Sequence, residues 1–217
     1  MNWSWIADNV GLIGTSLGQH LLLALIPVAA SFILSIPIGY LVFRSGAAGS
    51  NVILAIFGAI YSIPSLAIFV ALPLVIGTKV LDPLNVIVAL TIYTTALLSR
   101  SVVDGLRDVP ADVKQSADAI GFGRGRRFFR VELPLAMPVI FAGLRVASVS
   151  NIALTSISIL IGVPSLGTLF SRGLNQGFLT PVWVGLVLSI LVALLADLVI
   201  ILIQRGTLPW ARGGRTA

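Results

Sequence analysis

The chain has 217 residues, of which 57% are hydrophobic, and its mean hydropathy is +1.05. Only 14 Lys and Arg and 8 Asp and Glu are present, too few to cover the surface of a soluble domain of this length. The absence of cysteine excludes disulfides and cysteine-ligated metals. His20 is the only histidine, which argues against a histidine-based metal or catalytic site, so we expect no cofactor. The composition indicates a chain whose outside faces lipid.

The apolar residues are gathered into segments that are long enough to cross a membrane. A hydrocarbon core of about 30 Å needs roughly 20 residues of α-helix, and backbone groups within lipid must be paired inside each segment. The period-two polarity of a membrane β-barrel is absent. We therefore predict an all-α integral membrane protein with an external segment 1–16, a cytoplasmic tail 205–217 and five transmembrane helices, at about 21–43, 52–76, 84–99, 135–161 and 182–203.

The distribution of Lys and Arg predicts the orientation of these helices. Cytoplasmic loops of membrane proteins carry an excess of these residues. With the N-terminus outside, only Lys79 and Arg172 lie in external loops, if Arg145 is set aside as part of a span. The net charge of +6 thus belongs to one membrane face, and we expect the partner to be a lipid bilayer and not nucleic acid. The prediction is N-terminus out and C-terminus in.

The largest cytoplasmic loop, residues 107–134, has a pattern beyond its charge. The stretch "DVPADVKQSADAIG" favours a short helix that starts near Pro110 and stops at Gly121 or Gly123. Its apolar residues Val113, Ala117 and Ile120 have helical spacing. A second short helix, "RGRRFFRVEL", is expected to end before Pro134. Two short helices with small residues on one face could fit a groove on another protein.

At this loop the chain resembles the permease subunits of ATP-binding-cassette importers. Their cytoplasmic loop reads E-A-A, three residues, G, nine residues, I, one residue, L-P. Here Gln115 and Ser116 replace the first two letters, whereas the rest of the spacing is kept. The segments "AIYSIPSLAIFVALPLVIGT", "VELPLAMPVIFAGLRVASV" and "ILIGVPSLGTLFSRGLNQG" resemble the permeases for osmoprotectants over about residues 17–204. The positions that correspond to the ATPase-coupling motif are Gln115, Ser116, Ala117, Gly121, Val131, Leu133 and Pro134.

The resemblance implies a type I importer permease fold and a set of partners. Two permease subunits, identical or paralogous, would form the pathway, two cytoplasmic ATPases would dock near residues 111–123, and an external binding protein would deliver the solute. The chain has no P-loop, so ATP hydrolysis is assigned to the partner and the chain is not an enzyme. A quaternary ammonium osmoprotectant (glycine betaine, choline or carnitine) is the expected solute, with methionine or another amino acid as the alternative.

Two other classes of protein fit the sequence less well. An integral membrane enzyme would need a cluster of His, Asp or Glu near one face, and none is visible in the sequence. A stand-alone channel or secondary transporter would usually have more spans or an internal repeat. ATP-dependence of uptake separates these classes from an importer permease.

A few residues within the expected spans are candidates for the pathway or for gating. Pro64 lies in the middle of a span, beside Ser65, and frees a backbone carbonyl there, which gives either a kink that serves packing or a backbone patch that faces the pathway. Arg145 and Asp197 lie at similar depth, and either form an ion pair or stand apart, with Arg145 snorkelling to the surface. The polar rings near predicted interfaces are interpreted as membrane anchors; they are His20, Trp3, Trp5, Trp183 and Trp210.

Overall fold

The computed structural model describes residues 2–210, and every regular element in this part of the chain is a helix. In chain order the elements are α1 (Trp3–Asp8), α2 (Val10–Arg44), α3 (Gly46–Ser62), α4 (Ser65–Ile76), α5 (Pro83–Arg107), α6 (Ala111–Ala119), α7 (Arg124–Arg127), the π-helical turn η1 (Phe128–Glu132), α8 (Leu133–Thr155), the 3-10 turn η2 (Ser156–Ile161), α9 (Gly167–Asn175) and α10 (Leu179–Thr207).

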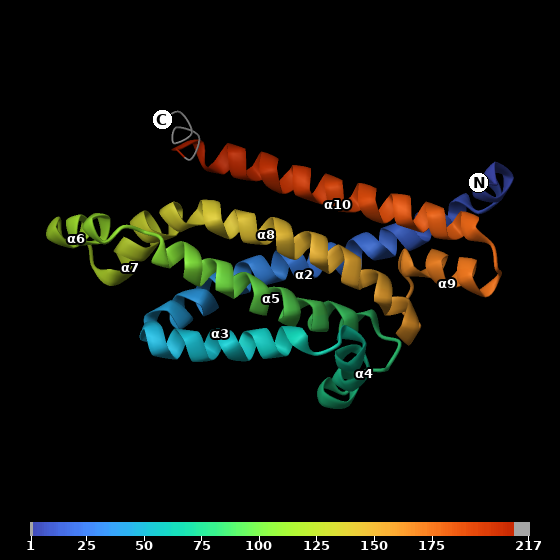
Figure 1. The fold of residues 1–217 in the computed structure, drawn as a ribbon, viewed down its shortest axis with the longest axis horizontal. Coiled ribbons are helices and arrows are strands. Elements are labelled where there is room, and N and C mark those ends of the chain that lie inside the picture. Colours follow the sequence, from blue (N-terminus) through green and yellow to red (C-terminus); the bar gives the residue numbers. More distant parts are fainter. Residues whose placement is uncertain (1, 211–217) are drawn as a thin grey trace.

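The long helices lie side by side and reverse direction from one to the next (Figure 1). Helices α10, α8, α5 and α3 follow one another across the molecule, and α2 packs on α5 and α8. The short helices α6 and α7 lie at one end of this bundle, which we call the α6 end. The N-terminus, α4 and α9 lie at the opposite end, which we call the α9 end.

The core of the bundle lies between α2, α5 and α8. Leu98 and Val102 of α5 and Ile140 of α8 have no exposed surface. The two helices approach closely because a side chain is missing at Gly105, where a Cβ atom would lie 2.9 Å from the carbonyl oxygen of Ala136. Helix α5 is therefore the central element, and α10, packed on α8 and α9, is the most peripheral of the long helices.

Four of the five predicted spans lie within single helical stretches, each of which extends beyond the predicted apolar segment at one or both ends. These four stretches are long and apolar enough to cross a membrane: Val10–Arg44, Pro83–Arg107, the continuous helical stretch Arg124–Ile161, and Leu179–Thr207. The predicted span 52–76 is instead a pair, α3 and α4, bent by 98°. The structure thus supports a membrane protein of four or five spans, and the count of five stays a prediction.

The bend between α3 and α4 is located at Ile63 and Pro64. Both residues are extended, with ψ of 133° and 127°, as expected where a proline excludes helical geometry from the residue before it. Tyr93 of α5 donates its hydroxyl to the carbonyl oxygen of Ile63 at 2.5 Å. The acceptor that the break frees therefore has a buried partner.

His20 is not the interfacial anchor that its position in the sequence suggested. Helix α2 begins at Val10, so that His20 lies about 15 Å along the helix and faces the core, with no exposed surface. Neither ring nitrogen has a hydrogen-bond partner among the described residues. The tryptophans differ from it, since Trp3, Trp183 and Trp210 each keep more than half of their surface exposed.

Candidate coupling and transport site

Helix α6 has the boundaries that the sequence predicted. It follows Pro110 and ends in a Schellman turn, in which Gly121 donates to the carbonyl of Asp118 and Phe122 donates to that of Ala117, both at 3.0 Å. Gly121 has a φ of 85°, in the left-handed region that glycine adopts without strain. The expected stop at Gly121 is confirmed, and its cause is backbone conformation.

The predicted apolar face of α6 does not form one surface. Ala117 is only 5% exposed and packs inside this chain, whereas Ile120 is 74% exposed and Val113 is half-buried. Ile120 lies just after the last residue of the helix, with φ of −87° and ψ of 11°, and so leaves the line set by the other two. Gln115, Ser116 and Gly121 are exposed.

The predicted second short helix is wrong, because Pro134 does not end a helix. Helix α7, η1 and α8 form one continuous helical stretch from Arg124, and Pro134 lies in the first turn of α8. The π-helical turn η1 accounts for this. The N–H of Leu133 donates to the carbonyl of Phe128, five residues back, and Pro134 itself needs no acceptor. Val131, Leu133 and Pro134 are half-buried on this stretch.

The four arginines of the loop have different surroundings. Arg124, Arg126 and Arg130 are exposed, and Arg126 lies 4.7 Å from the centre of the Phe122 ring. Arg127 instead contacts two carboxylates. Its Nε donates to Glu132 at 2.5 Å, and its NH1 donates to both oxygens of Asp118, at 2.7 and 2.5 Å.

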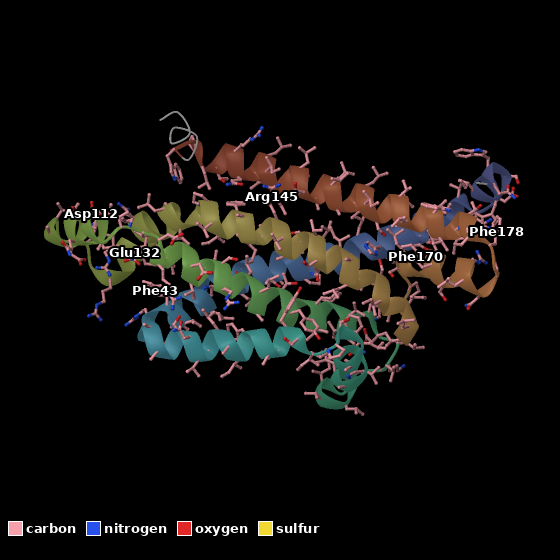
Figure 2. All side chains as sticks on the ribbon, in the orientation of Figure 1. Phe43, Asp112, Glu132, Arg145, Phe170 and Phe178 are labelled. Carbon is pink, nitrogen blue, oxygen red and sulfur yellow. The ribbon has the colours of Figure 1, made fainter. Side chains whose placement is uncertain are left out.

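A second basic residue attaches the other end of the same helix. Lys114 donates to the carbonyl of Leu106, in the last turn of α5, at 3.0 Å. Its ammonium group also lies 5.3 Å from the centre of the Phe43 ring in α2. Figure 2 shows Phe43 and Glu132 at the α6 end. Helix α6 is thus held to α5 and α2 through Lys114, and to α7 through the contact of Asp118 with Arg127.

Arg145 and Asp197, the two ionisable residues expected within spans, contact one another. Arg145 of α8 donates from Nε and NH2 to the two carboxylate oxygens of Asp197 in α10, at 2.6 and 2.9 Å. Figure 2 shows Arg145 between these helices. The pair lines a groove of about 700 Å³ between α8 and α10, and 41% and 26% of the two side chains are exposed. Of the two arrangements that the sequence left open, the structure has the ion pair.

The candidates Pro64 and Ser65 lie elsewhere, at the bend between α3 and α4. Close to it, Tyr61 and Arg100 line a cavity of about 90 Å³ between α3 and α5. Neither Tyr93 nor Glu132 was among the candidates from the sequence, because an isolated tyrosine or glutamate does not indicate its partner. Among the described residues no group of three or more His, Cys, Asp or Glu residues could hold a metal ion.

Residues 19–208 match the family described as "binding-protein-dependent transport system inner membrane component". The chain belongs to this family. It is 30% identical over 196 residues to the osmoprotectant import permease protein OsmW of Salmonella typhimurium, a match that covers 89% of this chain and 90% of the relative. It is 31% identical over 207 residues to the glycine betaine/carnitine/choline transport system permease protein OpuCD of Bacillus subtilis, covering 95% and 89%.

A solved structure has the same fold. The methionine ABC transporter MetNI in an inward-facing conformation contains a chain that aligns with a TM-score of 0.83, at 19% identity, over 92% of this chain and 98% of that one. At this identity the likeness concerns the fold alone. Family membership and the apolar helices make the chain a multi-pass protein of the bacterial inner membrane, in the permease class of transport components.

Proposed function

We propose that the chain is the pathway-forming subunit of an ATP-driven importer for a quaternary ammonium osmoprotectant such as glycine betaine, choline or carnitine. The observation that carries the proposal is the nearly full-length likeness to two permeases whose names specify osmoprotectants. ATP hydrolysis would come from a partner subunit, since the sequence has no P-loop. Methionine, the solute named for the structural neighbour, is the alternative solute.

We place the α6 end in the cytoplasm and the N-terminus outside. The support is the distribution of positive charge. The α9 end carries Lys79 and Arg172, whereas most other basic residues of the described chain lie toward the α6 end. Since the chain has no cysteine, single cysteines test this directly. With an impermeant thiol reagent outside intact cells, the exposed position Gln176→Cys should react and the exposed position Ala111→Cys should not; the opposite result would reverse the topology.

The partner ATPase would dock on α6. This helix projects at the extreme end of the bundle, and the exposed positions Gln115, Ser116 and Gly121 correspond to positions of the coupling motif, with Gly121 identical to it. Ile120 adds an apolar side chain to the same end. Ala117, which is buried in this chain, would contribute by holding α6 in place and not by direct contact. The external binding protein would meet the α9 end.

The pathway would lie on the surface that carries the ion pair. A charged group that faces lipid at the centre of a span costs about 3 kcal/mol on insertion scales. Arg145 and Asp197 offset part of that cost by pairing, but both remain partly exposed on this single chain. We therefore propose that a second permease subunit covers this surface and encloses the pathway. Pro64 and Ser65, at the bend between α3 and α4, are proposed to form a second part of the gate.

The test is uptake by proteoliposomes that contain the permease with its ATPase and binding protein. Labelled glycine betaine should accumulate only when ATP is available to the ATPase. Unlabelled choline and carnitine should compete, and methionine should not. Competition by methionine alone would favour the amino-acid alternative, and uptake without ATP would favour a channel or a secondary transporter.

A further inference from the structure

The surroundings of Arg127 distinguish it from the neighbouring arginines in a way that bears on coupling. The Asp118 side chain, in the last turn of α6, is 52% exposed, whereas the Glu132 side chain, at the end of η1 and directly before α8, is only 3% exposed. Arg127 lies between them and contacts both. It is the only residue of the described chain that forms an ion pair with either α6 or η1.

The geometry of this contact is rigid. A guanidinium group is planar, and here two of its edges are used, one by each carboxylate. The Glu132 side chain has no other hydrogen-bond partner among the described residues. Because this carboxylate is buried, a movement of α6 that displaced Arg127 would also weaken the hydrogen bond on which the buried charge depends. Packing also stabilises this region, since the centroids of the Phe128 and Tyr40 rings are 4.0 Å apart.

We propose that Arg127 is a positioning residue that fixes α6 to the helical stretch of α8, so that a push on α6 moves α8 as one body. The proposal rests on the proposed function, in which an ATPase docks on α6. Lys114 gives α6 its second attachment, to α5. The helix is thereby linked to the two helices that pack together in the core. In this account Arg127 acts within the protein, and Arg126 has no part in coupling.

A distance measurement tests the positioning without any partner. Nitroxide labels at Gln115→Cys in α6 and Leu135→Cys in α8, both exposed positions, report the distance between the two helices. We expect a narrow distance distribution in the otherwise unchanged protein and in the control Arg126→Gln. Arg127→Gln should broaden it, and Arg127→Lys, which keeps the charge but cannot contact both carboxylates along two edges, should broaden it less.

Loss of folding is separated from loss of positioning by a second variant. The double substitution Arg127→Gln with Glu132→Gln removes the buried charge together with its partner, a change that can be nearly neutral for stability. We expect it to insert at normal abundance and still to show the broad distribution. In the reconstituted complex it should take up several-fold less solute per ATP hydrolysed than Arg126→Gln does.

Normal abundance with an unchanged distance distribution and an unchanged ratio of uptake to hydrolysis in the double variant would overturn the positioning role. Failure of the proposed function gives a different result. In that case the unsubstituted complex would show no ATP-driven uptake, while the label distances of the permease alone would still respond to Arg127→Gln.

Discussion

Pro64 and Pro134 both lie in apolar helical sequence, yet one interrupts the helix and the other does not. At Pro64 two residues become extended, the chain bends by 98°, and the Tyr93 hydroxyl of a neighbouring helix donates to the carbonyl oxygen of Ile63. At Pro134, which has no N–H group, the helix continues because the preceding π-helical turn pairs the N–H of Leu133 with the carbonyl of Phe128. The difference indicates that the available hydrogen-bond partner, and not the proline alone, decides the local structure.

Like the backbone groups at the two prolines, the charges of Arg145 and Asp197 depend on an available partner. Removing one member of this ion pair should have the largest effect of the substitutions considered. Arg145→Ala and Asp197→Ala each leave one charge without its partner on an otherwise apolar surface. We expect each to lower abundance or uptake strongly, and the double substitution to recover part of the loss. Ser150→Ala, in the same groove, is the control. Strictly additive losses would show that the pair has no functional coupling.

Removing the partner at the Pro64 bend should have the next largest effect. Tyr93→Phe leaves the carbonyl of Ile63 without its donor, beside the buried ring of residue 93, which should lower the free energy of unfolding by about 1–2 kcal/mol. Tyr61→Phe is a matched control, because that hydroxyl has no hydrogen-bond partner among the described residues. Thermal unfolding in detergent measures both, and equal stabilities would argue against the proposed role of the Tyr93 hydroxyl.

Gly121 and Gly125, in the loop before Pro134, should change the free energy of unfolding in opposite directions when each is replaced by alanine. Gly121→Ala places a side chain at a φ of 85°, which costs about 1–2 kcal/mol although the space around it is open. Asparagine at the same position should cost less. Gly125, inside α7 with ordinary helical backbone and open space, should gain about 0.5–1 kcal/mol as alanine. The same unfolding assay applies, and destabilisation by both alanines would contradict the backbone explanation.

Pro134→Ala should have the smallest effect, below about 1 kcal/mol, because the helix already continues through this position and only the conformational restriction of the unfolded chain is lost. Pro64→Ala is the comparison, and it should change uptake more because it removes the restriction that favours the bend. A larger loss of stability or uptake for Pro134→Ala would mean that the π-helical turn depends on the proline itself.

The sequence by itself determined the all-helical membrane class, the family, the short helix that ends at Gly121, and the side of the molecule that collects positive charge. Each of these depends on composition or on local spacing, which a single segment carries. The family resemblance in the loop and the apolar segments was confirmed by the family match over residues 19–208.

The tertiary structure alone decided where polar groups find their partners. It placed His20 in the core, buried Ala117, bent the segment 52–76, carried the helix through Pro134 and made Arg127 the link between Asp118 and Glu132. It also chose the ion pair over snorkelling for Arg145. The burial of His20 and Ala117, the bend at Pro64 and the pairing of Arg145 depend on contacts between different helices, which no single segment of the sequence specifies. The π-helical turn before Pro134 and the contacts of Arg127 are closer along the chain, but they depend on the three-dimensional path of the backbone, which residue spacing alone does not give.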